Sequence, residues 1–188
     1  MKQKIPCHII AGFLGSGKSL LIKQLLSYKP ADEKWAVLVN EIGNNKYPQQ
    51  LYLANNIFIK EVYGGCLCCS AGMPFAVALN KLIKDVRPDR LFIEPAGAGH
   101  LANIQKLLRN QFYQPVLQLK ETLCIVSSEQ VNDKKYYDNE SYLSLISHSD
   151  RLCINANSTI AATQQLAKHY DKSFYPLQQN RHDLALIL

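Results

Sequence analysis

A short glycine-rich stretch constrains this chain more than any other feature. Residues 12–19 read Gly-Phe-Leu-Gly-Ser-Gly-Lys-Ser, which matches the pattern G-x-x-x-x-G-K-[ST] in full. An apolar run precedes it and an amphipathic helical pattern follows, so the stretch joins a predicted strand to a predicted helix. In that setting the backbone N–H groups can point at phosphate oxygens, and the helix dipole adds positive potential. The stretch therefore predicts a P-loop, with phosphate contacts from Gly12, Gly15, Ser16 and Gly17.

Two side chains at the end of this loop carry the predicted chemistry. Lys18 is expected to bridge the β- and γ-phosphates of a nucleotide, and Ser19 to give its hydroxyl to Mg²⁺. Further along, Glu94 ends an apolar run and opens the sequence Glu-Pro-Ala-Gly97. An acidic residue there suits the magnesium shell or the attacking water, which makes Glu94 a candidate magnesium and catalytic residue beside Lys18. Gly97 would let a backbone N–H approach the γ-phosphate, although Glu94-Pro95 could also be only a strand-ending turn.

Apolar runs alternate with helical patterns along the chain, which predicts an α/β fold with a mainly parallel sheet flanked by helices. Strands are expected at 5–11, 35–40, 57–62, 90–94, 117–127 and 151–155. Helices are expected at 18–28, 74–85, 100–109, 142–147 and 158–170. The stretches 43–50, 64–73, 95–99 and 129–139 read as irregular. Three of these follow strands, so they should gather at the carboxyl edge of the sheet, where such folds bind ligands.

Length and composition narrow the choice of protein class. The 188 residues, 47% hydrophobic and 19% charged, suit one globular domain, residues 1–188. No run approaches the roughly 18 apolar residues of a membrane helix, so we expect no membrane partner. The net charge of +6 comes from scattered Lys and Arg residues, without the basic and aromatic interleaving that binds bases. A generally basic surface, and no nucleic-acid partner, is the interpretation.

A run of cysteines is the second strong signal. Of the six cysteines, three are Cys66, Cys68 and Cys69, directly after two glycines. Thiolates suit Zn²⁺, which prefers four ligands, so a turn would have to gather all three and a fourth ligand must come from Glu41, water or a partner protein. A redox-active or merely buried cluster is the alternative. The other three, Cys7, Cys124 and Cys153, sit singly in apolar segments and read as core residues of a cytoplasmic protein.

The combined motifs resemble one known family. GFLGSGKS, Asn40-Glu41-Ile42-Gly43, EVYGGCLCCS and IEPAG occur in the order and spacing of the CobW-like P-loop GTPases, relatives of UreG and HypB. The resemblance implies a SIMIBI-type three-layer GTPase domain that handles a metal. It further implies GTP as substrate, zinc or another transition metal as cargo bound by the cysteine motif, and an unidentified client metalloprotein. Asn155 would begin the base-recognition motif.

The chain departs from this family in three places. Asn155-Ala-Asn-Ser158 stands where the family usually has Asn-Lys-x-Asp, and the missing Asp would normally accept two hydrogen bonds from guanine. Such charge-assisted bonds contribute about 1.5–3 kcal/mol each, so guanine selectivity should fall. Asn44, Asn45 and Lys46 replace common acidic residues, which weakens the role of Glu41. The family's usual smaller C-terminal domain is expected to be absent.

Three functions remain open from the sequence. The first is a GTP-hydrolysing metallochaperone for zinc. The second is a degenerate family member that binds nucleotide or metal as a sensor or partner module with little hydrolysis. The third is an ATP-using small-molecule kinase, which would leave the cysteine run unexplained. His100 follows Gly97-Ala-Gly99 and is more often a helix-start residue than a ligand.

Overall fold

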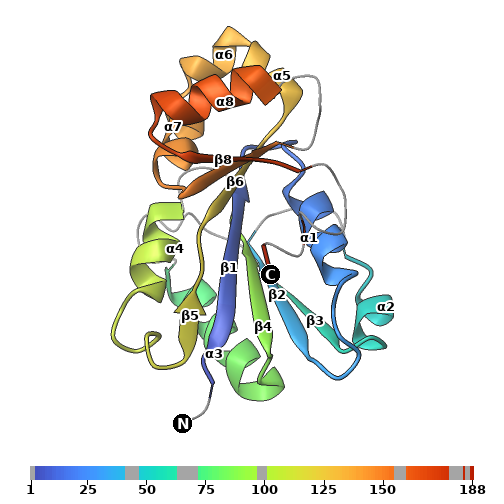
Figure 1. Ribbon diagram of the computed structural model, residues 1–188. Helices are drawn as coiled ribbons and strands as arrows, with labels where there is room; N and C mark the ends of the chain where they lie inside the picture. Colours follow the sequence, from blue (N-terminus) through green and yellow to red (C-terminus); the bar gives the residue numbers. More distant parts are fainter. Residues whose placement is uncertain are drawn as a thin grey trace. The chain divides into compact units, whose positions relative to one another are not determined.

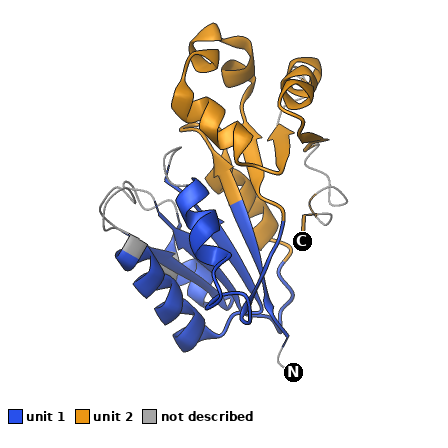
Figure 2. Cartoon of the chain, turned by 90° about the vertical axis from the view of Figure 1, so that its left-hand side faces the viewer, with its two compact units in different colours: residues 1–9, 29–120 blue, residues 10–28, 121–188 orange. Residues whose placement is uncertain are grey.

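The computed structural model describes residues 3–40, 47–62, 72–96, 101–154, 160–177, 184 and 187–188. The chain forms two compact units, each assembled from two separate stretches of sequence (Figure 2). The first unit comprises Met1–Ile9 and Lys29–Lys120, and the second comprises Ile10–Tyr28 and Glu121–Leu188. Strand β1 (Ile5–Gly12) contributes its first residues to one unit and its last residues to the other.

The first unit contains a parallel sheet in which β2 pairs with β3 and β4, and the beginning of β1 pairs with β4 and β5 (Figure 1). Its other strands are β2 (Trp35–Val39), β3 (Ile57–Glu61), β4 (Arg90–Glu94) and β5 (Leu117–Leu119). Its helices are α2 (Gln49–Leu53), α3 (Gly72–Val86) and α4 (Leu101–Leu108). Every residue of β2 is buried, as expected for a strand covered on both faces.

Helix α3 packs against β2 and β3 through one apolar face. Phe75, Ala78, Leu79 and Leu82 are buried at the spacing of three and four residues that places side chains on one side of a helix. Met73, on another face, is exposed. This pattern explains why the segment is helical and which side of it covers the sheet.

A histidine lies inside the sheet of the first unit. His8 is buried on β1, its ring stacks on Phe92, and its Nε2 lies 2.7 Å from a guanidinium nitrogen of Arg90. Because arginine can only donate, His8 Nε2 accepts and the ring is neutral. Burial, and then the positive charges of Arg90 and Lys120, lower the pKa of His8 to about 3.

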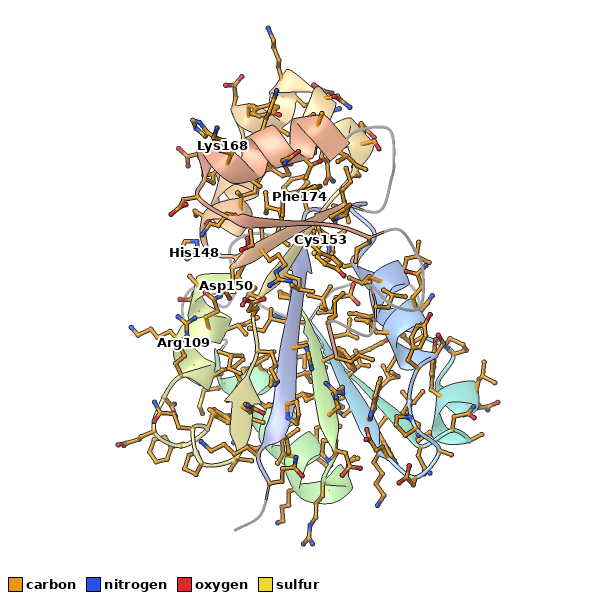
Figure 3. The ribbon with its side chains drawn as sticks, viewed as in Figure 1. Arg109, His148, Asp150, Cys153, Lys168 and Phe174 are labelled. Atoms are coloured by element: carbon orange, nitrogen blue, oxygen red, sulfur yellow. The ribbon has the colours of Figure 1, made fainter. Side chains whose placement is uncertain are left out.

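The second unit is also built on parallel strands. The end of β1 pairs with β6 (Leu123–Val126), β6 with β7 (Arg151–Ile154), and β7 with β8 (Ser173–Pro176). Cys153 and Phe174 lie on the paired strands β7 and β8 (Figure 3). The helices are α1 (Lys18–Leu26), α5 (Ser128–Asn132), α6 (Lys134–Tyr137), α7 (Glu140–Ser147) and α8 (Ile160–His169). Helix α8 packs on β7 and β8, and α5 packs against α8.

The expected parallel α/β architecture is confirmed, with corrections to individual elements. The run 117–127 is not one strand: β5 and β6 pair with different parts of β1, and residues 120–122 separate them. The stretch 129–139 is not irregular, because it contains most of α5 and all of α6. Each of these helices has a side-chain cap, from Ser127 with Gln130 in a capping box and from Asp133. Helix α2 and strand β8 were not expected either, and α2 begins within the stretch 43–50 that was expected to be irregular.

The helices of the described ranges are all too short or too polar to cross a bilayer.

Candidate phosphate-binding site

The second unit contains the predicted P-loop, which connects the end of β1 at Gly12 to the start of α1 at Lys18. Gly12 has φ 152°, and a Cβ atom there would lie 2.5 Å from the carbonyl oxygen of Ile125 on β6. Gly17 caps α1 in a left-handed conformation, with φ 99°. Glycine is required at both positions, at the first for space and at the second for conformation. These residues let a strand turn sharply into a helix.

Lys18 reaches back across the loop that precedes it. Its side chain is buried, and its ammonium group donates to the carbonyl oxygens of Gly12 at 3.0 Å and Phe13 at 3.1 Å. The first turn of α1 contains no acidic residue, so nothing there offsets the positive end of the helix dipole. The sequence-predicted residues Gly12, Lys18 and Ser19 are thus brought to one loop and helix start.

The buried hydroxyl of Ser16, in the loop, can form a further hydrogen bond. Ser16 is buried, and its Oγ has no hydrogen-bond partner within the described part of the chain. This atom lies beneath Gly12, where it is one of the atoms nearest to a Cβ added at that glycine. Buried hydroxyls normally find a partner, so an unpaired one inside a glycine loop fits a ligand with acceptor oxygens.

Residues 127–142 support the loop, and the sequence did not single them out. The ring of Phe13 packs edge-on against Tyr136 and Tyr142, with centroid distances of 5.8 and 6.1 Å. The side-chain amide of Gln130 donates to the carbonyl oxygen of Leu14 at 3.0 Å. The signal for Gln130 was the spacing Ser127-x-x-Gln130, which is a capping-box pattern at a helix start.

Glu94 belongs to the first unit and ends β4 as predicted. Its side chain is fully buried and accepts a hydrogen bond of 2.7 Å from the hydroxyl of Tyr47, which is also buried. Asn40 donates its backbone N–H to the Glu94 carbonyl oxygen at 2.9 Å. Sequence reasoning missed Tyr47, because it treated 43–50 as irregular. An aromatic residue within a polar stretch was the available signal.

The remaining predicted site residues lie outside the described residues. They are Glu41, Cys66, Cys68, Cys69, Gly97, His100 and Asn155. Within the described ranges, no three His, Cys, Asp or Glu side chains form a group that could hold a metal ion. Cys7, Cys124 and Cys153 are buried as expected, and burial raises the pKa of each thiol to about 12.

A parallel sheet whose first strand passes through this glycine loop into a helix defines the P-loop class of nucleotide-binding folds. Within that class, residues 6–182 match the family described as CobW/HypB/UreG, nucleotide-binding domain, and the chain belongs to this family. The resemblance predicted from the sequence is therefore confirmed.

Individual relatives agree with this assignment. The chain is 39% identical over 181 residues to the zinc chaperone YeiR of Escherichia coli K12, covering 96% of this chain and 53% of YeiR. It is 28% identical over 180 residues to zinc-regulated GTPase metalloprotein activator 1 of Saccharomyces cerevisiae, covering 87% of this chain and 39% of that protein. The chain thus spans about half the length, or less, of these curated relatives.

A solved structure supports the fold. The Zn(II)-bound YjiA GTPase from E. coli superposes with a TM-score of 0.68 at 18% identity, over 100% of this chain and 62% of YjiA. At that identity the likeness shows the fold alone. The expected SIMIBI-type P-loop fold is confirmed.

Proposed function

We propose that this chain is the nucleotide-binding part of a cytoplasmic zinc chaperone that binds and hydrolyses GTP. The assembled glycine loop, with its buried lysine and a serine hydroxyl that has no partner among the described residues, is the observation that carries the proposal. The name of YeiR, a zinc chaperone, and that of the yeast GTPase metalloprotein activator support the choice of nucleotide and cargo. The client that would receive the zinc is an unidentified metalloprotein.

In this proposal the loop residues bind the triphosphate. Backbone N–H groups of Gly15 and Gly17 donate to phosphate oxygens, and the Lys18 ammonium group, already held over the loop by two carbonyl oxygens, neutralises the β- and γ-phosphates. The Ser16 hydroxyl, which has no partner in the described part of the chain, gains an acceptor. Gly97 and Asn155 would contact the γ-phosphate and the base.

The Ser19 hydroxyl is a hard oxygen donor at this loop, and a Mg²⁺ ion held there would supply charge neutralisation at the triphosphate. The Ser19 hydroxyl, on the first turn of α1, and the Glu94 carboxylate are the proposed groups that hold it. Glu94 also orients the attacking water in this scheme. The hydrogen bond from Tyr47 restricts the orientation of this carboxylate.

Nucleotide titrations test the first half of the proposal. We expect GTP and Mg²⁺ to bind the wild-type protein, and Lys18→Ala to weaken binding by about 100-fold or more, because two charge-assisted bonds at about 1.5–3 kcal/mol each are lost. Lys23→Ala, on the last turn of the same helix, is the matched control. No heat with GTP or ATP in calorimetry would refute nucleotide binding, and an effect of Lys23→Ala equal to that of Lys18→Ala would refute the role of Lys18.

Zinc competition tests the second half. Cys66, Cys68 and Cys69 are the proposed zinc ligands, with Glu41 as a candidate fourth. Wild-type protein should take Zn²⁺ from a chelator with an affinity that changes when GTP is added, and the triple Cys→Ser variant should not. That variant must still bind GTP, which separates loss of zinc from loss of fold. Equal zinc affinity with and without GTP would exclude the chaperone mechanism.

A sensor or partner module with little hydrolysis is the second candidate, because Asn155-Ala-Asn-Ser158 lacks the usual guanine-binding Asp. Phosphate release separates the two candidates. Tight GTP binding without measurable release, in the presence of Mg²⁺ and Zn²⁺, would favour the module. Equal affinity for GTP and ATP would show that the altered motif no longer selects guanine.

A further inference from the structure

Contacts within the phosphate loop do little to fix the backbone at Leu14 and Gly15. The Leu14 side chain is 73% exposed, so it does not anchor the backbone by packing. Gly15 follows with φ 76° and open space where a side chain would be. Within the loop, the Ser16 N–H donates to the Phe13 carbonyl oxygen at 3.2 Å. The conformation of residues 14 and 15 therefore depends on contacts from outside the loop.

Gln130 supplies such a contact, and both ends of its amide are used. Its Nε2 donates to the Leu14 carbonyl oxygen at 3.0 Å, and its Oε1 accepts from the Ser127 N–H at 3.1 Å. Because one partner is an acceptor and the other a donor, the orientation of the amide is fixed. Gln130 is 2% exposed, and its backbone N–H is bonded to the Ser127 hydroxyl. The side chain is thus a rigid link from the end of β6 to the loop.

Holding the Leu14 carbonyl has a direct effect on the next residue. The peptide group is planar and trans, so the C=O of Leu14 and the N–H of Gly15 point in opposite directions. A donor that fixes the first therefore fixes the second. Gly15 N–H is one of the donors that the proposed function assigns to phosphate.

We propose that Gln130 is a positioning residue for the phosphate loop, which aims the Gly15 N–H by holding the Leu14 carbonyl. The inference rests on the nucleotide binding proposed above, and it adds a residue from outside the loop motif to that site. A donor aimed before the ligand arrives lowers the ordering cost of binding. Losing the link should weaken binding of any ligand with a polyphosphate group, whatever its base.

The test compares variants with matched charge and size. Gln130→Glu keeps the acceptor for Ser127 but cannot donate to Leu14. Gln130→Met fills the same buried space without polar atoms. Asn132→Asp makes the same amide-to-carboxylate change on the same helix, at an exposed residue whose amide bonds to Ser128. Each protein is titrated with GTP and with inorganic tripolyphosphate, in Mg²⁺, well below its unfolding temperature.

We expect both Gln130 variants to bind both ligands about tenfold more weakly, and Asn132→Asp to bind within about twofold of wild type. A purely structural role would lower the unfolding temperature and leave the affinity of the folded protein unchanged, which would overturn the inference. If Gln130→Glu does not fold, Gln130→Met decides. Failure of the wild-type protein to bind would refute the proposed function and this inference together, whereas normal binding by the variants refutes only the inference.

Discussion

Replacing Gly12 by alanine tests the geometry of the loop without any ligand. At φ 152° the backbone of a residue that carries a side chain is strained. The added Cβ would also lie 2.5 Å from the Ile125 carbonyl oxygen and 3.3 Å from Cγ of Lys18. Strained backbone costs roughly 1–3 kcal/mol, and overpacking against a neighbour adds typically about 1–3 kcal/mol. We expect Gly12→Ala to lose about 3 kcal/mol or more of unfolding free energy, because the added Cβ would lie closer still to the buried Ser16 hydroxyl and because the Ile125 carbonyl oxygen, a backbone atom, cannot rotate away.

Gly15→Ala is the matched control. Gly15 also has a left-handed φ, 76°, but nothing lies within 4 Å of its added Cβ. Its cost should be about 1 kcal/mol, from conformation alone. Urea denaturation of the nucleotide-free proteins, followed by far-ultraviolet circular dichroism, measures both. The difference of about 2 kcal/mol corresponds to roughly 4–8 °C in unfolding temperature for a chain of this size. Equal losses in the two variants would refute the close approach of Gly12 to β6.

Three further predictions concern buried polar groups. Tyr47→Phe removes the donor to the Glu94 carboxylate and should lower the free energy of unfolding by about 1–3 kcal/mol. The fluorescence of Trp35, the one tryptophan, reports this as unfolding at a lower urea concentration, because Trp35 lies in the same unit. An unchanged urea midpoint would contradict the hydrogen bond. The folded-state pKa of His8, about 3, lies below the ordinary histidine value of 6.5. As the pH falls, the unfolded chain therefore takes up a proton before the folded chain does. The free energy of unfolding should decrease below about pH 6.5, by up to about 1.4 kcal/mol per pH unit. Urea midpoints at about pH 7 and about pH 5 should differ less in His8→Gln than in wild type; an equal difference would exclude His8 as the source. Burial raises the thiol pKa values of Cys7, Cys124 and Cys153 to about 12, so these thiols should resist iodoacetamide until the protein unfolds. Mass spectrometry of the alkylated peptides measures the labelling. Rapid labelling of the folded protein would argue against the burial of these residues.

Local sequence patterns were sufficient for the elements that depend on local rules. The glycine loop was predicted because its conformations need glycine at Gly12 and Gly17, and β2 because an unbroken apolar run suits a strand buried on both faces. Helix α5 was missed although Ser127 and Gln130 have capping-box spacing, because its five residues are too few to show helical periodicity.

Contacts between distant residues could not be predicted in this way. Tyr47 and Glu94 are 47 positions apart, and Gln130 and Leu14 are 116 apart. No local pattern states which tyrosine meets which carboxylate, since the pairing follows from how strands are ordered in a sheet. The site residues that one sequence can predict are therefore those in a contiguous motif, and the residues that support them need the fold.

The separation of 116 positions between Leu14 and Gln130 also has a consequence for biosynthesis. At about 5–20 residues per second, a ribosome needs roughly 6–23 s to add the residues that separate them. Throughout that interval Ile10, which ends up fully buried, lacks its pairing partner Leu123 on β6. The glycine loop is therefore synthesised well before the segment that supports it, and the pairing of Ile10 with Leu123 must form late in synthesis.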